Sequence, residues 1–235
     1  MGKRMVFIMG IGFLLVTVSI PGVLAQEQPF TVGMRIGPFI PQDWQIQGYT
    51  AIYYNSEGSP TGATVLGFGN GVDLGFYGSY YSPYNWGLML EASGRLLLKK
   101  KLDMAFTTGK DYYENRLIIF PITLSLTHKI SVPNSKITPY LGIGTGVYIS
   151  EWEQKHYPEG AERTWLKGSS NIIGVHFLTG FNCPLYYNIL FDCELRYSYA
   201  ETDLKIKDVD KNTETELKNL NIGGVSLKLG LGFRF

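Results

Sequence analysis

The last stretch of the chain constrains its fold more than any other. Residues 225–235 read V-S-L-K-L-G-L-G-F-R-F, with an apolar side chain at every second position and a small or cationic residue between. Because successive side chains of a strand point to opposite faces, this segment would have one apolar and one polar face. In a transmembrane barrel the apolar face contacts lipid and the polar face lines the lumen. We therefore expect a closing barrel strand, whose end at Phe235 would engage the barrel-assembly machinery.

Seven earlier segments repeat this alternation. The pattern predicts an all-β protein, an eight-stranded antiparallel up-and-down transmembrane β-barrel. Each strand is close to the roughly 9–11 residues that a tilted bilayer-spanning strand requires. A slip in phase near Gly223 predicts a β-bulge in the last strand. The predicted strands cover about 30–40, 71–81, 86–96, 115–127, 138–150, 171–182, 189–199 and 225–235.

The predicted connections alternate between short turns, at 82–85, 128–137 and 183–187, and long charged loops. This asymmetry is typical of bacterial outer-membrane barrels, so both termini are expected in the periplasm. The charged loops leave open a structural or adhesin-like role at the cell surface. The long loops are 41–70, 99–114, 151–170 and 201–218.

The N-terminus resembles an export signal. A basic pair precedes an apolar run over residues 5–18, and Ala25 ends a small-residue cleavage site. The run is shorter than the roughly 20 apolar residues of a transmembrane helix, which is the alternative interpretation. The prediction is a Sec-type signal peptide over residues 1–25 and a single barrel domain over residues 26–235.

Composition excludes some partners. The 21 basic and 20 acidic residues give a net charge of +1, which offers no electrostatic reason to expect nucleic acid. The partners that the pattern does predict are outer-membrane lipids. Frequent glycine (28) and tyrosine (16) fit an all-β chain.

The same alternation could also describe a lipocalin, whose apolar face lines the barrel and whose polar face meets water. The polar face here carries mostly small residues and single charges of nearly balanced sign. Because buried charges persist when they are paired, we predict a lumen closed by ion pairs, without a large water-filled pore. The predicted ion-pair network comprises Arg35, Asp73, Glu91, Arg95, Asp192, Glu194, Arg196, Lys228 and Arg234.

Aromatic residues gather near the predicted strand ends. Two lipid-interface belts are expected, with ordinary β-propensity as the alternative explanation. The belt beside the turns would contain Tyr80, Tyr81, Tyr84, Trp86, Tyr186, Tyr187, Phe233 and Phe235, and the belt beside the loops Tyr112, Tyr113, Tyr148, Trp152, Tyr197 and Tyr199.

The strands over 115–182 present small residues to the lumen. One interpretation is steric, since small residues make room for long side chains reaching across. The other is a cavity with a lateral exit at Pro121, because proline cannot donate to a strand ladder; a tolerated bulge is the alternative there. The candidate region comprises Pro121, Thr123, Ser125, Gly142, Gly144, Gly146 and His176.

Enzymatic chemistry has little support in the sequence. The histidines show no metal-site spacing, and none pairs with a serine near the predicted outer rim, so we expect no catalytic residues, cofactor or metal. His176 is predicted to hydrogen-bond across the lumen to Glu194 or Arg196. Cys183 and Cys193 would lie too far apart along the barrel axis for a disulfide. A lipid-modifying outer-membrane enzyme is kept as the less favoured alternative.

Two segments carry a family resemblance. Phe120-Pro121-Ile122-Thr123 and the stretch T-P-Y-L-G-I-G-T-G-V-Y over 138–148 resemble the small outer-membrane barrels of the OmpW type and the broader OmpA-like superfamily. The resemblance implies a narrow, partly apolar passage for small hydrophobic molecules.

Overall fold

The computed structural model describes residues 29–42, 49–54, 60–66, 70–100, 112–157, 164–208 and 214–235, so the predicted signal peptide over 1–25 lies outside the described residues. Within those ranges no helix is both long and apolar enough to cross a membrane. The strands are β1 (Phe30–Pro41), β2 (Tyr49–Tyr54), β3 (Pro60–Leu66), β4 (Gly71–Tyr81), β5 (Trp86–Lys100), β6 (Tyr112–Lys129), β7 (Thr138–Tyr157), β8 (Thr164–Tyr186), β9 (Ile189–Tyr199), β10 (Glu201–Asp208), β11 (Glu214–Asn221) and β12 (Gly224–Arg234).

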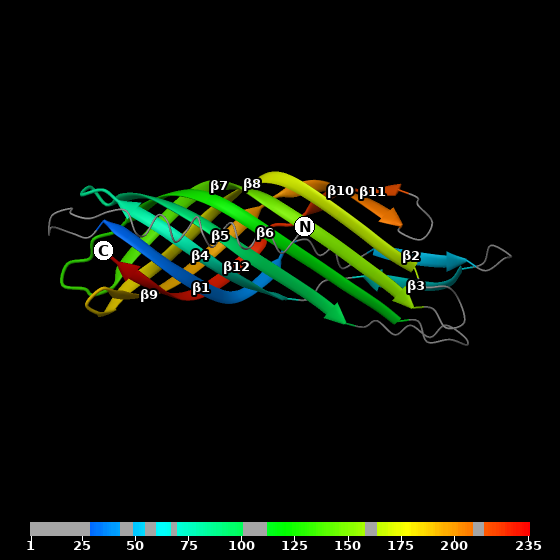
Figure 1. Cartoon of the computed structure of the whole chain (residues 1–235), viewed down its shortest axis with the longest axis horizontal. Coiled ribbons are helices and arrows are strands. Elements are labelled where there is room, and N and C mark those ends of the chain that lie inside the picture. Colours follow the sequence, from blue (N-terminus) through cyan, green and yellow to red (C-terminus); the bar gives the residue numbers. More distant parts are fainter. Residues whose placement is uncertain are drawn as a thin grey trace.

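The main sheet closes on itself as an eight-stranded antiparallel barrel. β1 pairs with β4 on one side and with β12 on the other, and the ladder continues through β5, β6, β7, β8 and β9 back to β12. β10 follows β9 along the chain, and β11 precedes β12. These two short strands therefore extend the barrel wall beyond β9 and β12 (Figure 1). The prediction of an eight-stranded up-and-down barrel is confirmed.

The two ends of the barrel differ. Short turns connect the strands at one end, here called the turn end, where Asn85 takes the left-handed conformation with φ 66°. β8 extends to Tyr186, so the turn predicted at 183–187 is tighter than expected and centres on Tyr187, with φ 39°. Cys183 near this turn and Cys193 in the middle of β9 are free.

The opposite end, here called the loop end, contains more strand than the sequence indicated. β7 continues past its predicted end at residue 150, β8 begins before its predicted start at residue 171, and β10 pairs with β11 inside the predicted loop 201–218. β2 and β3 form a separate hairpin beyond this end (Figure 1). The extensions of β7 and β8 and the strand β10 were missed because their outward residues are mostly charged or polar, so the apolar alternation that identifies a membrane strand stops before the strand does.

The bulge predicted near Gly223 is an interruption between β11 and β12. The Ile222 amide donates to the Ala200 carbonyl at 2.8 Å, and the Gln42 amide donates to the Gly223 carbonyl at 3.1 Å. Facing strands β9 and β10 break at the same level, at Ala200.

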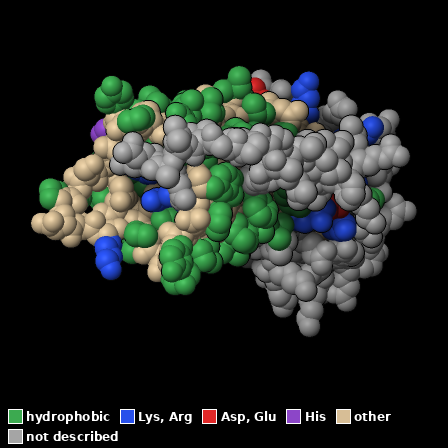
Figure 2. Space-filling view, turned by 60° about the vertical axis from the view of Figure 1, so that its left-hand side comes forward, with side chains coloured by type: hydrophobic (Ala, Val, Ile, Leu, Met, Phe, Trp, Pro, Cys, Tyr) green, Lys and Arg blue, Asp and Glu red, His purple; other side chains and the backbone are tan. Residues whose placement is uncertain are grey.

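Apolar side chains cover the outside of the barrel and charged ones fill its inside. Leu90 and Phe177 are each 56% exposed, whereas Glu194 and Arg196 are 0% exposed. Figure 2 shows hydrophobic side chains gathered over the middle of the described face. This orientation excludes the lipocalin alternative, because a lipocalin would place these side chains inside.

The predicted aromatic belts are present only in part. At the turn end, Tyr84 and Tyr187 are exposed, as is Trp86. At the loop end, the assignment of Tyr148 and Trp152 is wrong: Tyr148 is fully buried in the lumen, and Trp152 packs against the same cluster. Both have the inward parity of β7, which continues through Trp152. The side chains of Tyr112 and Tyr113 lie outside the described part of the structure.

Candidate functional site

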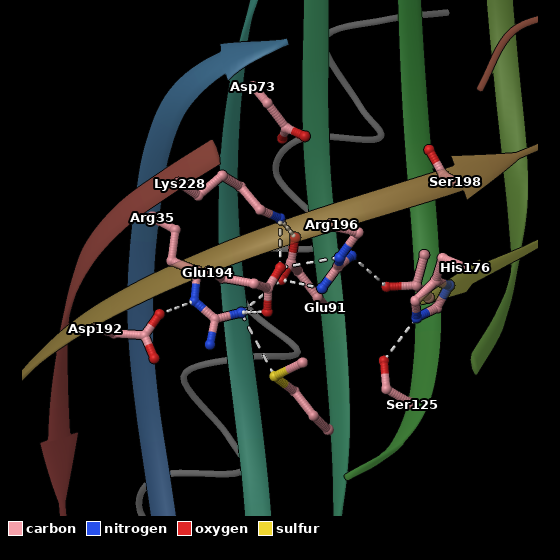
Figure 3. A network of polar contacts seen from close by, with 12 residues as sticks. Arg35, Asp73, Glu91, Ser125, His176, Asp192, Glu194, Arg196, Ser198 and Lys228 are labelled. Carbon is pink, nitrogen blue, oxygen red and sulfur yellow. Dashed lines mark hydrogen bonds and ion pairs between the residues drawn. The ribbon is translucent and has the colours of Figure 1, made fainter. Parts of the chain in front are cut away.

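A compact group of charged side chains crosses the lumen between the turn end and mid-height. We call it the ionic layer, and all of its side chains are at most 2% exposed. Three cations face three carboxylates, so the layer is neutral as a whole (Figure 3). Its members are Arg35 on β1, Glu91 on β5, Asp192, Glu194 and Arg196 on β9, and Lys228 on β12.

Arg35 joins the two sides of this layer. Its Nη1 atom lies 3.0 Å from Glu91 Oε2 and 2.7 Å from Glu194 Oε2, and its Nε donates to Asp192. The guanidinium stacks on the Tyr77 ring, 3.8 Å from the ring centroid. Because a guanidinium is planar with five donors, it can satisfy carboxylates from strands far apart in sequence.

Arg196 on β9 and Lys228 on β12 complete the layer. Arg196 Nη2 lies 2.9 Å from Glu91 Oε2, and its Nε lies 2.9 Å from Glu194 Oε1. Lys228 contacts Glu91 and also lies 3.3 Å from Glu194 Oε1. Lys228 and Glu194 are direct register partners between β12 and β9, so the backbone pairing itself brings them together.

Two further residues in contact with Arg35 were not predicted as members of the network. Tyr140 accepts a hydrogen bond from Arg35 Nη2 and donates one to Asp192 Oδ2, both at 3.2 Å. The Met89 sulfur accepts a weak hydrogen bond from Arg35 Nη1 at 3.5 Å. The alternation placed both side chains in the lumen, but only their positions along the barrel axis bring them to Arg35.

The other predicted network residues lie elsewhere. Arg95 and Asp73 form a separate buried pair, with Arg95 Nε 3.0 Å from Asp73 Oδ2, and Arg95 also donates to Ser198 Oγ at 3.1 Å. Arg234 is only half-buried at the turn end, and no ion pair among the described residues includes it. It stands six residues beyond Lys228, about 20 Å along a strand, which is too far to reach the ionic layer. Its inclusion in the predicted network was wrong.

Apolar side chains occupy the lumen on the loop-end side of the ionic layer. We call this cluster the apolar layer; its members are Phe39, Leu97, Leu117, Ile119, Tyr148, Ala200 and Ile222. Along β6 the inward residues change from Thr123, which accepts a hydrogen bond from Arg196, through Pro121 to Ile119. Along this strand the lumen therefore changes from the ionic layer to the apolar layer.

The wall of small residues is covered by neighbouring side chains. A Cβ at Gly144 would lie 2.6 Å from the His176 ring and 2.2 Å from the Leu124 carbonyl, and one at Gly142 or Gly146 would also come within 3 Å of a neighbour. This packing favours the steric interpretation over the cavity.

His176 bonds to Ser125 across β7, with Nε2 and Oγ 2.8 Å apart, and not to Glu194 or Arg196 as predicted. Figure 3 shows this pair beside the ionic layer. The His176 Nδ1 atom has no hydrogen-bond partner among the described residues. The register that places His176 opposite Gly144 leaves its ring room to reach β6, which alternation alone could not indicate.

The ladder between β5 and β6 is interrupted at Pro121. Pairing is continuous from the turn end to Ala92↔Ile122 and resumes at Arg95↔Ile119 with the same register, so Ser93 and Gly94 have no paired residue on β6. The unchanged register excludes a bulge at Pro121, which was the alternative interpretation of this proline. Proline has no N–H to donate to the ladder. On the outer face the Phe120 ring lies over Gly94, 3.6 Å from where a Cβ would stand. We call this interruption the β5–β6 seam.

Residues 103–235 match the family model described as the OmpW family. The chain belongs to the OmpW family. This match covers more than half of the chain, including all strands from β6 onward. The protein is thus an outer-membrane β-barrel, and the resemblance stated from the sequence is confirmed.

Solved structures agree with the OmpW-family fold. OprG from Pseudomonas aeruginosa has a TM-score of 0.54 and 15% identity, over 89% of this chain and 97% of that chain. A major outer membrane protein from Thermus thermophilus has a TM-score of 0.50 and 15% identity, over 88% of this chain and 99% of that chain. No curated protein matches the chain. At this identity the likeness concerns the barrel fold alone.

Proposed function

We propose that this OmpW-family barrel is a non-enzymatic protein that admits small hydrophobic molecules from its loop end and releases them sideways into the membrane. The observation that carries the proposal is the position of the β5–β6 seam. Pro121 lies between Ile119 of the apolar layer and Thr123, which contacts Arg196 of the ionic layer. The seam is therefore level with the floor of the apolar part of the lumen.

The ionic layer supports a sideways route over an axial one. Moving an apolar molecule past six fully buried charged side chains would break ion pairs in a low-dielectric interior, at a cost of about 3–5 kcal/mol for each broken pair. The apolar layer imposes no such cost, because a solute there replaces one set of apolar contacts by another. These side chains fill the lumen, so a solute enters by displacing them.

A second interruption provides a comparison within the same barrel. The β1–β12 ladder lacks pairs at Gly37 and Pro38, again with unchanged register. There, however, a Cβ at Gly37 would lie 1.8 Å from the Leu227 carbonyl, so the strands are in close contact. At the β5–β6 seam the atoms nearest to Gly94 belong to a single movable ring, that of Phe120. Gly94 shares the outward side of β5 with Leu96, so this ring covers the outward side of the seam, which we assign to the exit.

The burial and the incomplete hydrogen bonding of the Ser125–His176 pair support the absence of an enzymatic role. Both side chains are 0% exposed, and no group among the described residues hydrogen-bonds to Nδ1 to orient the imidazole. A nucleophile and base need substrate access and an orienting partner. The pair is therefore assigned a structural role.

Uptake of radiolabelled octane by cells tests the proposal. Cells with the protein should take up octane faster than cells lacking it, and Pro121→Val, which restores an N–H to the seam, should remove most of that increase. Pro38→Val is the matched control and should leave uptake unchanged. In planar bilayers the purified parent protein should show no steady ion conductance. Equal octane uptake by Pro121→Val and the parent protein would refute lateral exit.

A further inference from the structure

Four buried polar atoms lack partners at one level of the lumen. They are Asp73 Oδ1, Arg95 Nη2, Tyr148 OH and Ser226 Oγ, which have no hydrogen bond to any described residue although their side chains are at most 1% exposed. Buried polar groups in native proteins are nearly always satisfied, so a group of exceptions calls for a ligand or internal water.

These atoms lie at the boundary between the ionic and apolar layers. Asp73 and Arg95 are direct register partners on β4 and β5, and Figure 3 shows Asp73 on the loop-end side of the ionic layer. The Arg95 guanidinium stands 4.5 Å from the centroid of the Phe39 ring and 5.6 Å from that of Tyr148. Both rings belong to the apolar layer, and Ser226 is the register partner of Phe39.

The free atoms of the Arg95–Asp73 pair have complementary chemistry. Arg95 Nη2 can only donate, and Asp73 Oδ1 can only accept while the carboxyl is ionised. A hydroxyl group matches both, because it accepts from one and donates to the other. A charged head group does not match, since the pair is already neutral and another buried charge would remain uncompensated.

We propose that the Arg95–Asp73 pair binds the uncharged hydroxyl head of a small amphiphile whose apolar body lies in the apolar layer. This inference rests on the proposed function and narrows its substrates to aliphatic alcohols of about the size of 1-octanol, in preference to alkanes or carboxylates. The ligand orientation follows from the layering: the head meets the polar floor, and the chain extends towards the loop end along Phe39 and Tyr148.

The test compares protein-dependent uptake of octane, 1-octanol and octanoate by cells. The parent should favour 1-octanol over octane by about tenfold, the ratio that corresponds to one well-formed hydrogen-bonding site. The double variant Asp73→Leu with Arg95→Leu removes both charges together and should bring this ratio to about one while octane uptake persists. Ser150→Ala, a buried serine whose hydroxyl is already paired with Ser170, is the control and should keep the ratio.

A spectroscopic measurement on the parent protein guards against a variant that does not fold. In nanodiscs, the guanidinium ¹⁵N–H signals of Arg95 should shift on addition of 1-octanol and stay in place with octane. Absence of any octane uptake by the parent would overturn the proposed function itself. Three results would overturn this inference alone: octane uptake without a preference for 1-octanol, a preference that survives in the double variant, or an unmoved Arg95 signal. Any of them would identify the four atoms as a site for internal water only.

Discussion

Neutralising Glu91 should strongly destabilise the barrel. Glu91 is 1% exposed and contacts all three cations: Arg35 at 3.0 Å, Arg196 at 2.9 Å, and Lys228. Glu91→Gln preserves the shape of the side chain but leaves three buried cations facing two carboxylates. Removing one partner of a buried ion pair costs about 3–5 kcal/mol, because the remaining charge is uncompensated in a low-dielectric site.

A double variant separates charge balance from lost contacts. Glu91→Gln with Lys228→Met restores equal numbers of buried cations and carboxylates, so it should recover a large part of the loss seen with Glu91→Gln alone. Glu153→Gln is the matched surface control. Its partner Arg116 lies 2.7 Å away but is 51% exposed, and exposed pairs contribute about 1 kcal/mol or less.

Urea unfolding of the protein in lipid vesicles, followed by tryptophan fluorescence, measures these differences. The expected order of stability, from highest to lowest, is the parent protein, Glu153→Gln, the double variant and Glu91→Gln. A loss below about 1 kcal/mol for Glu91→Gln would show that water or rearranged neighbours compensate the buried cations, and the account of the ionic layer would be refuted.

Three further outcomes follow from individual contacts. Gly144→Ala should cost about 1–3 kcal/mol in the same unfolding assay, because its Cβ would meet the Leu124 carbonyl at 2.2 Å, whereas Gly78→Ala, with open space around it, should be nearly neutral. Ser125→Ala should cost about 1–3 kcal/mol by leaving the buried His176 ring without a partner, and adding His176→Leu should recover most of it; equal stabilities would contradict the pairing. Partial burial tends to raise the pKa of Glu153, but the Trp165 hydrogen bond and the charges of Arg116, Lys155 and Lys167 outweigh it, so the pKa lies below its ordinary value. The stabilisation from Glu153 is thus complete above the ordinary pKa of a glutamate and is lost as pH falls through the lowered one, and the Trp165 indole signal in an NMR titration should report that low midpoint.

Alternation along each strand determined which side chains face the lumen. The lumen parity of Arg35, Glu91 and Glu194 follows from a period of two combined with one apolar and one polar face, and a slip of one residue would place those charges in lipid. The same reasoning would have placed Trp152 inside the barrel if β7 had been recognised beyond residue 150, where its outward face turns polar. The apolar outer face, the closing strand and the strand count were therefore readable from local sequence.

Only the closed barrel decided which inward side chains meet. Contacts across the lumen depend on strand tilt and on the stagger accumulated around the barrel, and neither can be predicted from the sequence of a single strand. That stagger brings His176 to Ser125 instead of Glu194, and it brings Arg35 to carboxylates on β5 and β9. The height of a residue along the barrel axis depends on how all the strands are staggered, and it sets the boundary between the charged and the apolar parts of the lumen. The face that a residue occupies depends only on that residue and its two neighbours in the strand.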